Sequence, residues 1–423
     1  TNNISVGNSV TAGSFVGPIE GNVTGNVTGN VTGDATGLSG NPSINTTGIV
    51  TATSFVPTVG QLSHRNLIIN GAMLISQRGT SSTSSGYHTV DRFAVQFGGT
   101  DEAATQAQVD VASGTSPYTN GFRKALKITN GNQSSGAGAA DYIRYRIRLE
   151  AQDIANSGWN YTSSSSYITL SFWIKSSVAQ NFYGHLHAVD GTQQGYPFET
   201  GSLTADTWTK ITKTIPGNSN LTFNNDNALG LEISIYGYLG TDYTASGVSS
   251  NAWAAWSSST YTTDQTSTWW TTNDATLELT GVQLEVGSVA TPFEHRSYGE
   301  ELIRCKRYFN MVADGIEARS GSSRSEGVIG NGFFWQSTRM MVPVKFQVTM
   351  RTPDWTLYKK NGEYRYYANG QSNQTCTQND IGLNGQEGLN SAHLNITNIS
   401  SSSAAGMFFV HDANAALGFD AEL

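Results

Sequence analysis

Six aromatic side chains gather in one polar stretch of the sequence, between Gly240 and Asp274. They stand among Ser, Thr, Asn and Asp residues, and the stretch is longer than an ordinary connection between strands. Recognition of a sugar requires flat aromatic faces against its C–H groups, with hydroxyls, amides and carboxylates nearby to bond its hydroxyls. The stretch therefore predicts a glycan contact made by Tyr243, Trp253, Trp256, Tyr261, Trp269 and Trp270.

Two of these side chains have a second interpretation. Trp269 and Trp270 are adjacent and could open the next strand, in which case they would pack in the core. A second aromatic group lies near the predicted hairpin turn at Asn361 and Gly362, between WTLYKK and EYRYYA. Some of its members must be core residues, but the group is an alternative receptor patch, formed by Trp355, Tyr358, Tyr364, Tyr366 and Tyr367.

Cationic and metal-binding side chains also share strand faces. Arg144, Arg146 and Arg148 alternate along one predicted strand and could meet phosphate or uronate groups, although such a stripe is more often a solvated face or a contact between subunits. His185 and His187 share a face and could be two metal ligands, but no third ligand is evident, so a hydrogen-bonded pair is the alternative.

Catalytic motifs are absent from the sequence. There is no GxSxG elbow, P-loop, HExxH pattern or dinucleotide fingerprint, and the acidic residues are sparse and scattered. We expect the chain not to be an enzyme. A glycan-cleaving site remains the alternative, because a pair of carboxylates is brought together in space and not in sequence.

Composition excludes several classes of function. Charged residues make up 13% of the chain and aromatic residues 10%, which favours an ordered protein with few charges. The net charge of −8 argues against nucleic-acid binding, which depends on Lys and Arg. No apolar run reaches transmembrane length and no signal peptide is present, so we expect no membrane insertion. We expect Cys305 and Cys376 to be free thiols.

The elements that position these residues are predicted to be strands. In the region from Asn66 to Arg296, apolar and polar residues alternate between clusters of Gly, Ser, Asn and Asp, which predicts a jelly roll or β-sandwich. The alternation changes phase at Gly281, which predicts a β-bulge there. Ser297 and Glu300 form a capping box at the start of a predicted helix over 297–310, and Glu300 can pair with Arg304.

The N-terminal repeat GNVTGNVTGNVTGDATG has one small apolar face and one polar face if it is extended. A single strand cannot bury its apolar face alone, so we expect a homotrimer with Val23, Val27, Val31 and Ala35 at its axis. A disordered Gly-rich linker is the alternative.

Three segments together resemble phage tail fibre proteins with a jelly-roll domain similar to carbohydrate-binding modules. They are NLIINGAMLISQRG from Asn66, VDRFAV from Val90, and LTGVQLEVGSVATPFEHRSYGEELIRCKRYF from Leu279. The resemblance implies a virion-borne homotrimer that binds a host-surface polysaccharide or lipopolysaccharide and joins other tail proteins through its N-terminus. The alternatives are a glycan-cleaving tailspike and a purely structural fibre segment that carries a separate tip protein. The resemblance also implies a possible structural calcium, for which the sequence gives no position. No binding residue can be carried over, because the middle loops of such proteins differ.

The predicted organisation is all-β. It consists of a repetitive, intertwined β-shaft and trimerisation segment over 1–64, a carbohydrate-binding-like jelly roll over 65–296, a helical connector over 297–310, and a C-terminal β-sandwich knob over 311–423.

Overall fold

The structure is a computed structural model that describes residues 64–314, 327–368, 371–383, 385, 388–400, 405–411 and 415–423. The chain divides into two compact units, Thr1–Val56 and Pro57–Leu423, and every described residue lies in the second. The predicted shaft, with Val23, Val27, Val31 and Ala35, lies outside the described residues, so the shaft and its trimer stay predictions.

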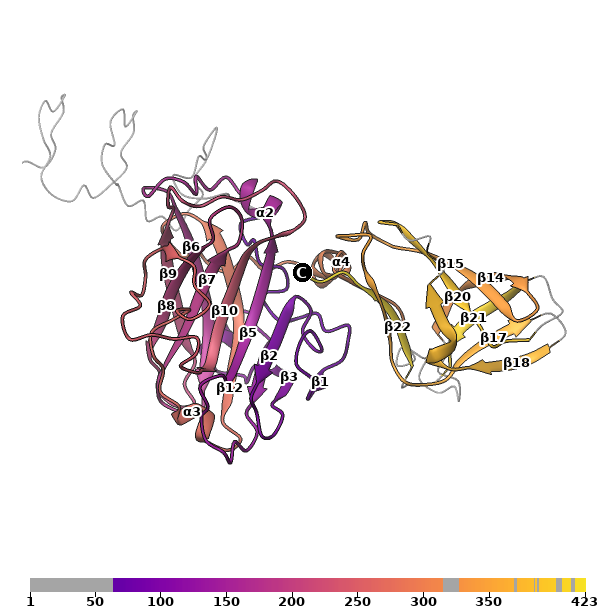
Figure 1. The fold of residues 1–423 in the computed structure, drawn as a ribbon, viewed down its shortest axis with the longest axis horizontal. Helices are drawn as coiled ribbons and strands as arrows, with labels where there is room; N and C mark the ends of the chain where they lie inside the picture. Colours follow the sequence, from indigo (N-terminus) through magenta and orange to yellow (C-terminus); the bar gives the residue numbers. More distant parts are fainter. Residues whose placement is uncertain are drawn as a thin grey trace, which may run out of the picture. The chain divides into compact units, whose positions relative to one another are not determined.

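Two antiparallel sheets form the first half of the described unit (Figure 1). Sheet A has the order β1 (Ser81–Ser82), β3 (Thr105–Asp110), β4 (Lys124–Thr129), β12 (Thr276–Val286), β6 (Tyr167–Ser176) and β9 (Thr209–Pro216). Sheet B has the order β11 (Ala254–Ala255), β8 (Gln194–Ser202), β7 (Asn181–Ala188), β10 (Leu229–Leu239), β5 (Tyr142–Glu150) and β2 (Phe93–Gly98).

The core lies between these sheets because alternate residues of each strand point to the same side. On β5, Ile143, Tyr145 and Ile147 are buried, and the Tyr145 hydroxyl donates to the Leu126 carbonyl of sheet A at 3.0 Å. Sheet A carries the predicted bulge, since the register of β12 against β6 shifts after Thr280 and Gly281 has φ +63°. The prediction of an all-β, jelly-roll type sandwich is confirmed.

Helices are few and short. Three of them have four or five residues, namely α1 (Ser116–Thr119), α2 (Ala151–Ala155) and α3 (Thr268–Thr271). The predicted capped helix is confirmed as α4 (Tyr298–Lys306), where the Ser297 side chain accepts from the Glu300 amide and Arg304 pairs with Glu300 at 3.3 Å. It ends earlier than predicted, because the chain enters β13 at Phe309. None of the helices in the described ranges is long and apolar enough to cross a membrane.

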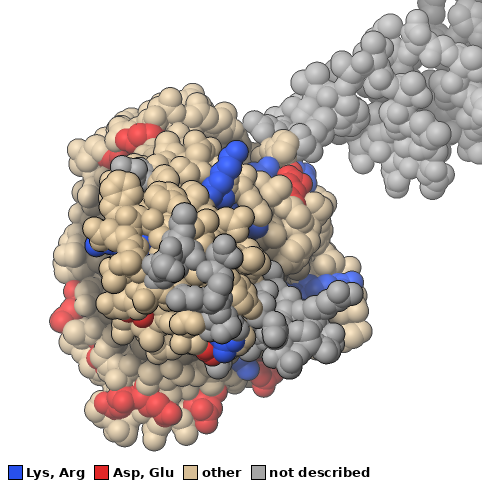
Figure 2. All heavy atoms as spheres, turned by 90° about the vertical axis from the view of Figure 1, so that its right-hand side faces the viewer, with Lys and Arg blue, Asp and Glu red and all other residues tan. Residues whose placement is uncertain are grey.

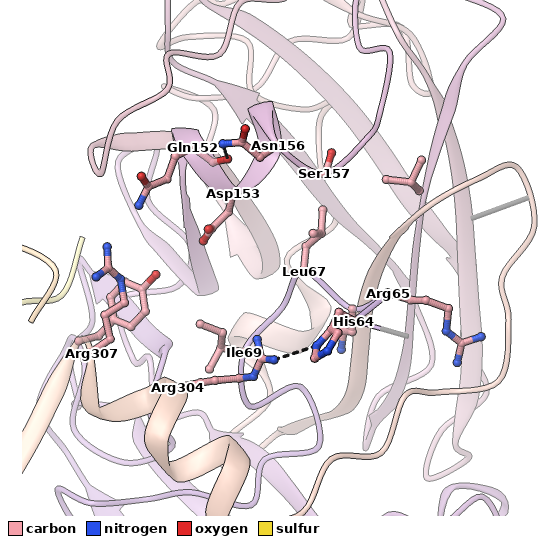
Figure 3. Close-up of a pocket in the computed structure, with 13 residues that line it drawn as sticks. His64, Arg65, Leu67, Ile69, Gln152, Asp153, Asn156, Ser157, Arg304 and Arg307 are labelled. Carbon is pink, nitrogen blue, oxygen red and sulfur yellow. Dashed lines mark hydrogen bonds between the residues drawn. The ribbon is translucent and has the colours of Figure 1, made fainter. Parts of the chain in front are cut away.

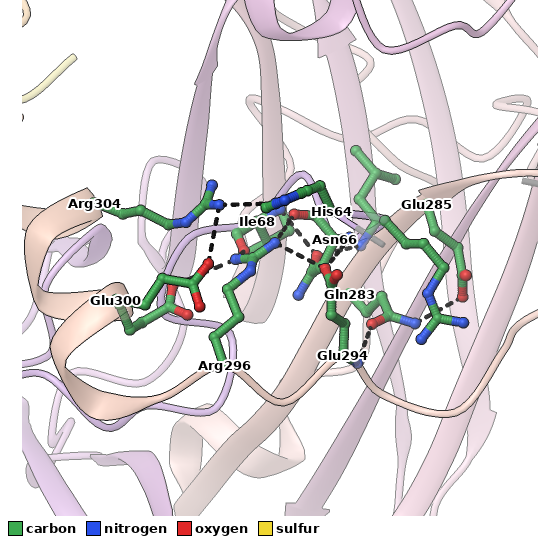
Figure 4. Close-up of polar contacts among 12 residues, drawn as sticks. His64, Asn66, Ile68, Gln283, Glu285, Glu294, Arg296, Glu300 and Arg304 are labelled. Carbon is green, nitrogen blue, oxygen red and sulfur yellow. Dashed lines mark hydrogen bonds and ion pairs between the residues drawn. The ribbon is translucent and has the colours of Figure 1, made fainter. Parts of the chain in front are cut away.

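Two of the three segments that carry the family resemblance, those from Asn66 and from Leu279, meet in one polar network (Figure 4). The Asn66 side chain donates to the Val282 carbonyl at 3.0 Å and accepts from the amides of Ile68 at 2.9 Å and Leu284 at 3.1 Å. The Asn66 amide donates to Glu294 at 2.9 Å, and Arg296 donates to the Asn66 carbonyl. These hydrogen bonds connect the start of the jelly roll to β12 and to the segment before α4. The residues of the family resemblance that take part in them therefore have a structural role.

A separate core lies beneath the C-terminal sheets. A three-stranded sheet has the order β13 (Phe309–Asp314), β22 (Ala416–Asp420) and β16 (Thr356–Lys359). A seven-stranded sheet has the order β18 (Gln371–Cys376), β17 (Tyr364–Ala368), β21 (Ala405–Val410), β14 (Gly327–Gln336), β15 (Arg339–Lys345), β20 (Ser391–Ile396) and β19 (Ile381–Leu383), with a 3-10 turn, η2 (Gln378–Asp380), before β19. Cys305 and Cys376 are buried and free, as predicted.

The predicted hairpin at Asn361 and Gly362 is wrong. β16 pairs with β22, whereas β17 pairs with β18 and β21, so the turn joins two different sheets. A β-carbon on Gly362 would lie 2.4 Å from the Ala415 nitrogen, which shows that glycine serves a close backbone approach here.

The end of the described chain returns to the start of the C-terminal domain. β22 pairs antiparallel with β13, and the Ala421 amide donates to the Tyr308 carbonyl at 2.7 Å. Asp420 then pairs with Arg78 at 2.8 Å. The C-terminal domain is therefore entered and left at neighbouring positions.

Candidate functional site

A column of aromatic rings lies on the outer face of sheet B. Trp256 stacks on His187 with ring centres 3.6 Å apart and on Tyr261 with ring centres 4.5 Å apart. Tyr261 stacks on Tyr243 at 5.7 Å, and Tyr142 meets Tyr243 edge to face at 6.2 Å. Three of the six aromatic residues proposed from the 240–274 stretch are thus brought together.

Backbone pairing positions this column. Ala254 of β11 pairs with Gly195 of β8, which places the following Trp256 over the sheet, and a β-carbon on Gly195 would lie 2.9 Å from the indole. The Tyr261 amide donates to the Tyr243 carbonyl at 2.8 Å, so the two tyrosines come from adjacent, paired segments of the long loop. Their rings therefore lie side by side.

A cavity of about 180 Å³ lies at the tyrosine end of the column, lined by Tyr142, Arg144, Tyr236, Leu239, Tyr243 and Tyr261. Tyr236 and Leu239 are buried, whereas the other four side chains are half-buried and reach solvent. Sites for drug-sized ligands are typically roughly 300–1,000 Å³. This cavity is therefore smaller than a typical site for a drug-sized ligand.

Arg144 is the cationic side chain of this cavity, and its orientation is fixed from behind. Its guanidinium group donates to Gln96 at 2.9 Å, to Glu232 at 3.1 Å and to the Ser234 hydroxyl at 3.1 Å. Burial raises the pKa of Glu232, but Arg144 and Arg148 outweigh burial and hold that pKa below its ordinary value. Glu232 therefore stays ionised and keeps Arg144 in place.

His185 and Tyr236 form the buried base of the site. The Tyr236 hydroxyl and the His185 Nδ1 atom are 3.1 Å apart. Burial lowers the pKa of His185 to about 3, so the imidazole is neutral at neutral pH. His187 bonds Gln193 at 3.0 Å and lies 6.5 Å from His185 between ring centres. The two histidines thus form hydrogen bonds with different partners.

Metal ligands do not converge in the described ranges, where no group of three or more His, Cys, Asp or Glu side chains could hold an ion. The structural calcium implied by the family resemblance has no position here and stays a prediction.

Two of the proposed glycan contacts are wrong. Trp269 and Trp270 have no exposed surface, and their indole N–H groups donate to the carbonyls of Thr276 at 3.0 Å and Gly136 at 2.8 Å. They pack in the jelly-roll core, which was the alternative predicted for these two residues from the sequence. Trp253 is half-buried, packs on the core and on Tyr196, and donates to the Pro216 carbonyl at 2.7 Å.

Sequence reasoning missed Tyr142, Tyr236 and Leu239. Tyr236 faces outward because its neighbours in sequence, such as Ile235, face the core, and it lies directly opposite Arg144 in the register of β10 and β5. The outward alternation of both strands was visible in the sequence. Their pairing was not, because 92 positions separate Tyr236 from Arg144 and register depends on the whole sheet.

The alternative receptor patch is largely wrong. Trp355, Tyr364 and Tyr366 are core residues with at most 5% exposure. Tyr358 and Tyr367 are half-buried but belong to different sheets, and Tyr367 stacks on Phe409. In the view of Figure 2, charged side chains are scattered over a mostly uncharged surface. Because three of its members lie in the core and the other two belong to different sheets, the patch forms no single aromatic platform.

A larger cavity of about 440 Å³ lies beside α4 and α2 (Figure 3), but its cations are already engaged. Arg307 makes two hydrogen bonds of 2.8 Å to Glu150, Arg304 pairs with Glu300, and Arg65 donates to the Pro292 carbonyl. Its lining rings are those of His64 and Tyr308, and within the described residues these two rings do not stack on each other. It lacks the stacked faces that distinguish the smaller cavity.

Neither the scan against protein families nor the search of curated proteins finds a match. Solved structures do match, at low identity. A tailspike protein 4 enzymatically active domain of bacteriophage CBA120 is 10% identical, with a TM-score of 0.28 over 52% of this chain and 21% of that one. A CBM4 module is 12% identical, with a TM-score of 0.26 over 52% and 99% of the two chains.

The xylan-binding CBM22-1 domain of Paenibacillus barcinonensis Xyn10C is 10% identical, with a TM-score of 0.25 over 56% of this chain and 100% of that one. This chain spans about a fifth of the tailspike domain. At these scores the likenesses carry no argument about function, which must come from the site itself.

Proposed function

We propose that this chain is the receptor-binding part of a phage tail fibre, which attaches to a host-surface polysaccharide or lipopolysaccharide without cleaving it. The observation that carries the proposal is the cavity between Tyr142, Tyr243 and Tyr261, where flat rings and a fixed guanidinium group converge. Rings supply stacking surface for the C–H faces of a sugar, and Arg144 supplies donors for its oxygens.

Attachment in this proposal depends on several copies. One small cavity gives a weak contact, so a homotrimer wound through the GNVT repeat would raise the affinity through effective concentration. The family resemblance of the segments from Asn66, Val90 and Leu279 supports a virion location and an N-terminal junction with other tail proteins.

Cleavage is the rival function. Glycoside hydrolysis generally uses a pair of carboxylates about 5–10 Å apart across the scissile bond. None of the six residues that line the cavity is acidic, which favours binding. Incubation with polysaccharide from a sensitive host distinguishes the two functions, because shortened chains would identify an enzyme and retention without shortening would identify an adhesin.

The binding site is tested by Tyr243→Ala, which removes the ring between Tyr142 and Tyr261 in the column. We expect adsorption to host cells to weaken at least 10-fold, since aromatic hot spots are worth about 2 kcal/mol or more. Tyr243→Phe, which keeps the ring, should retain most of the binding. Tyr367→Ala is the matched control, because Tyr367 is a half-buried tyrosine that also stacks on an aromatic neighbour.

Circular dichroism should show that all three variants are folded. If Tyr243→Ala binds as well as the parent, the cavity is not the receptor site. If Tyr367→Ala is the variant that loses binding, the C-terminal sheet carries recognition.

A further inference from the structure

Three arginines follow one another along the outer face of β5, and they are not equivalent. Arg144 and Arg148 both pair with Glu232, at 3.1 Å and 2.8 Å. Arg148 also donates to the Leu423 carbonyl at 2.9 Å. Arg146 lies between them and, within the described ranges, has neither an ion pair nor a hydrogen bond, although its guanidinium carbon lies 6.0 Å from the centre of the Tyr87 ring.

The surroundings of Arg146 explain why it has no hydrogen-bond or ion-pair partner. Its cross-strand neighbours are Ala94 on β2 and Ser234 on β10. Alanine offers no acceptor, and the Ser234 hydroxyl already bonds Arg144 and Glu232. The Arg146 Nε atom is buried without a hydrogen-bond partner. A buried donor left unpaired costs about 1–3 kcal/mol.

The local charge is positive although the chain as a whole is acidic. Arg144, Arg146 and Arg148 contribute +3 and Glu232 contributes −1, which leaves +2 on this patch, against −8 for the whole chain. Burial lowers the pKa of Arg146, and the neighbouring Arg148 and Arg144 lower it further, although Tyr87 and Glu232 act in the opposite direction. An anion beside Arg146 would satisfy its free donors and offset this repulsion.

Arg146 is also close to the cavity. It is two residues from Arg144, which lines the cavity, so the two side chains leave β5 about 7 Å apart at ordinary strand rise. One ligand could therefore reach both places. Its sugar ring would lie between the tyrosines, and a charged substituent or a neighbouring unit would contact Arg146.

We propose that the glycan recognised by this site is acidic, with its carboxylate, sulfate or phosphate group bound by Arg146. This inference rests on the proposed glycan-binding function and narrows it to a class of polysaccharide. The fork of the guanidinium group suits bidentate bonding of such oxyanions.

The test compares the full chain with Arg146→Gln on an array of neutral and acidic bacterial glycans, and on two polymer pairs of known charge. These pairs are dextran against dextran sulfate, for the sulfate group, and galactomannan against polygalacturonate, for the carboxylate. Arg123→Gln is the control, because it removes the same charge from an exposed arginine that directly precedes β4 of sheet A.

We expect the parent to prefer acidic glycans and to bind them less tightly as salt rises. Arg146→Gln should bind them about 10-fold more weakly, as for loss of a charge-assisted hydrogen bond, and should bind neutral glycans unchanged. Arg146→Lys should recover part of the loss, and Arg123→Gln should behave as the parent.

Equal binding of acidic glycans by the parent and Arg146→Gln would overturn the inference. A parent that binds only neutral glycans, with Tyr243→Ala abolishing that binding, would overturn the inference and leave the proposed function standing. Binding to no glycan at all would overturn both.

Discussion

Replacement of Asn66 by alanine should destabilise the jelly roll more than any surface change. Asn66 is 4% exposed, and its side chain bonds the Val282 carbonyl and the amides of Ile68 and Leu284. Alanine would leave these three backbone groups buried and unpaired. At about 1–3 kcal/mol for each group, with partial relaxation, we expect a loss of about 3–5 kcal/mol. For a domain of this size that corresponds to a fall in Tm of about 10 °C.

Calorimetry of the full chain measures this loss, and hydrogen exchange locates it. The Ile68 and Leu284 amides should exchange much faster in Asn66→Ala, because they lose their acceptor. Asn132→Ala is the control, since Asn132 is exposed, and its effect should stay within about 0.5 kcal/mol. A loss below about 1 kcal/mol, or unchanged exchange at both amides, would refute the structural role assigned to the motif.

Two further predictions concern assembly and pH. Val27→Asp should weaken the trimer expected from the GNVT repeat, because like charges would meet unpaired at the axis, while Asn26→Asp should be tolerated. Native mass spectrometry and thermal melting of both variants measure the effect on the trimer. A stable monomer with the repeat intact would contradict the prediction. The folded-state pKa of His185, about 3, lies below the ordinary value of 6.5, so its neutral form contributes stability above about pH 6.5 that is lost as the pH falls towards 3. Urea unfolding at pH 7 and pH 5 should show a smaller loss for His185→Gln than for the parent, and equal losses would show that His185 is not held neutral.

Local features of the fold were predictable from the sequence. Alternation around Ile143 and Tyr145 identified a strand and its buried face, because the side-chain period of a strand is two. The phase change at Gly281 identified the bulge, and Ser297 with Glu300 identified the start of α4. Each of these signals depends on residues within a few positions of one another.

Features that depend on distant pairing were not predictable. The sequence grouped Trp269 with Trp256, although the first fills the core and the second lies on the sheet, because composition does not distinguish a loop from a buried turn. The Asn361 turn predicted a hairpin, but β16 pairs with β22 and not with β17. Tyr142 and Tyr236 join the site only through the register of β5 with β10.

The first and last strands of the C-terminal β-region, β13 and β22, pair with each other, so this region begins and ends at neighbouring positions. Domains whose ends lie close together tolerate insertion and exchange, because a replacement needs to match only one short junction. Exchange of the segment between these two strands would leave the aromatic column in place, provided that the replacement keeps the contacts of Asp420 with Arg78 and of Leu423 with Arg148.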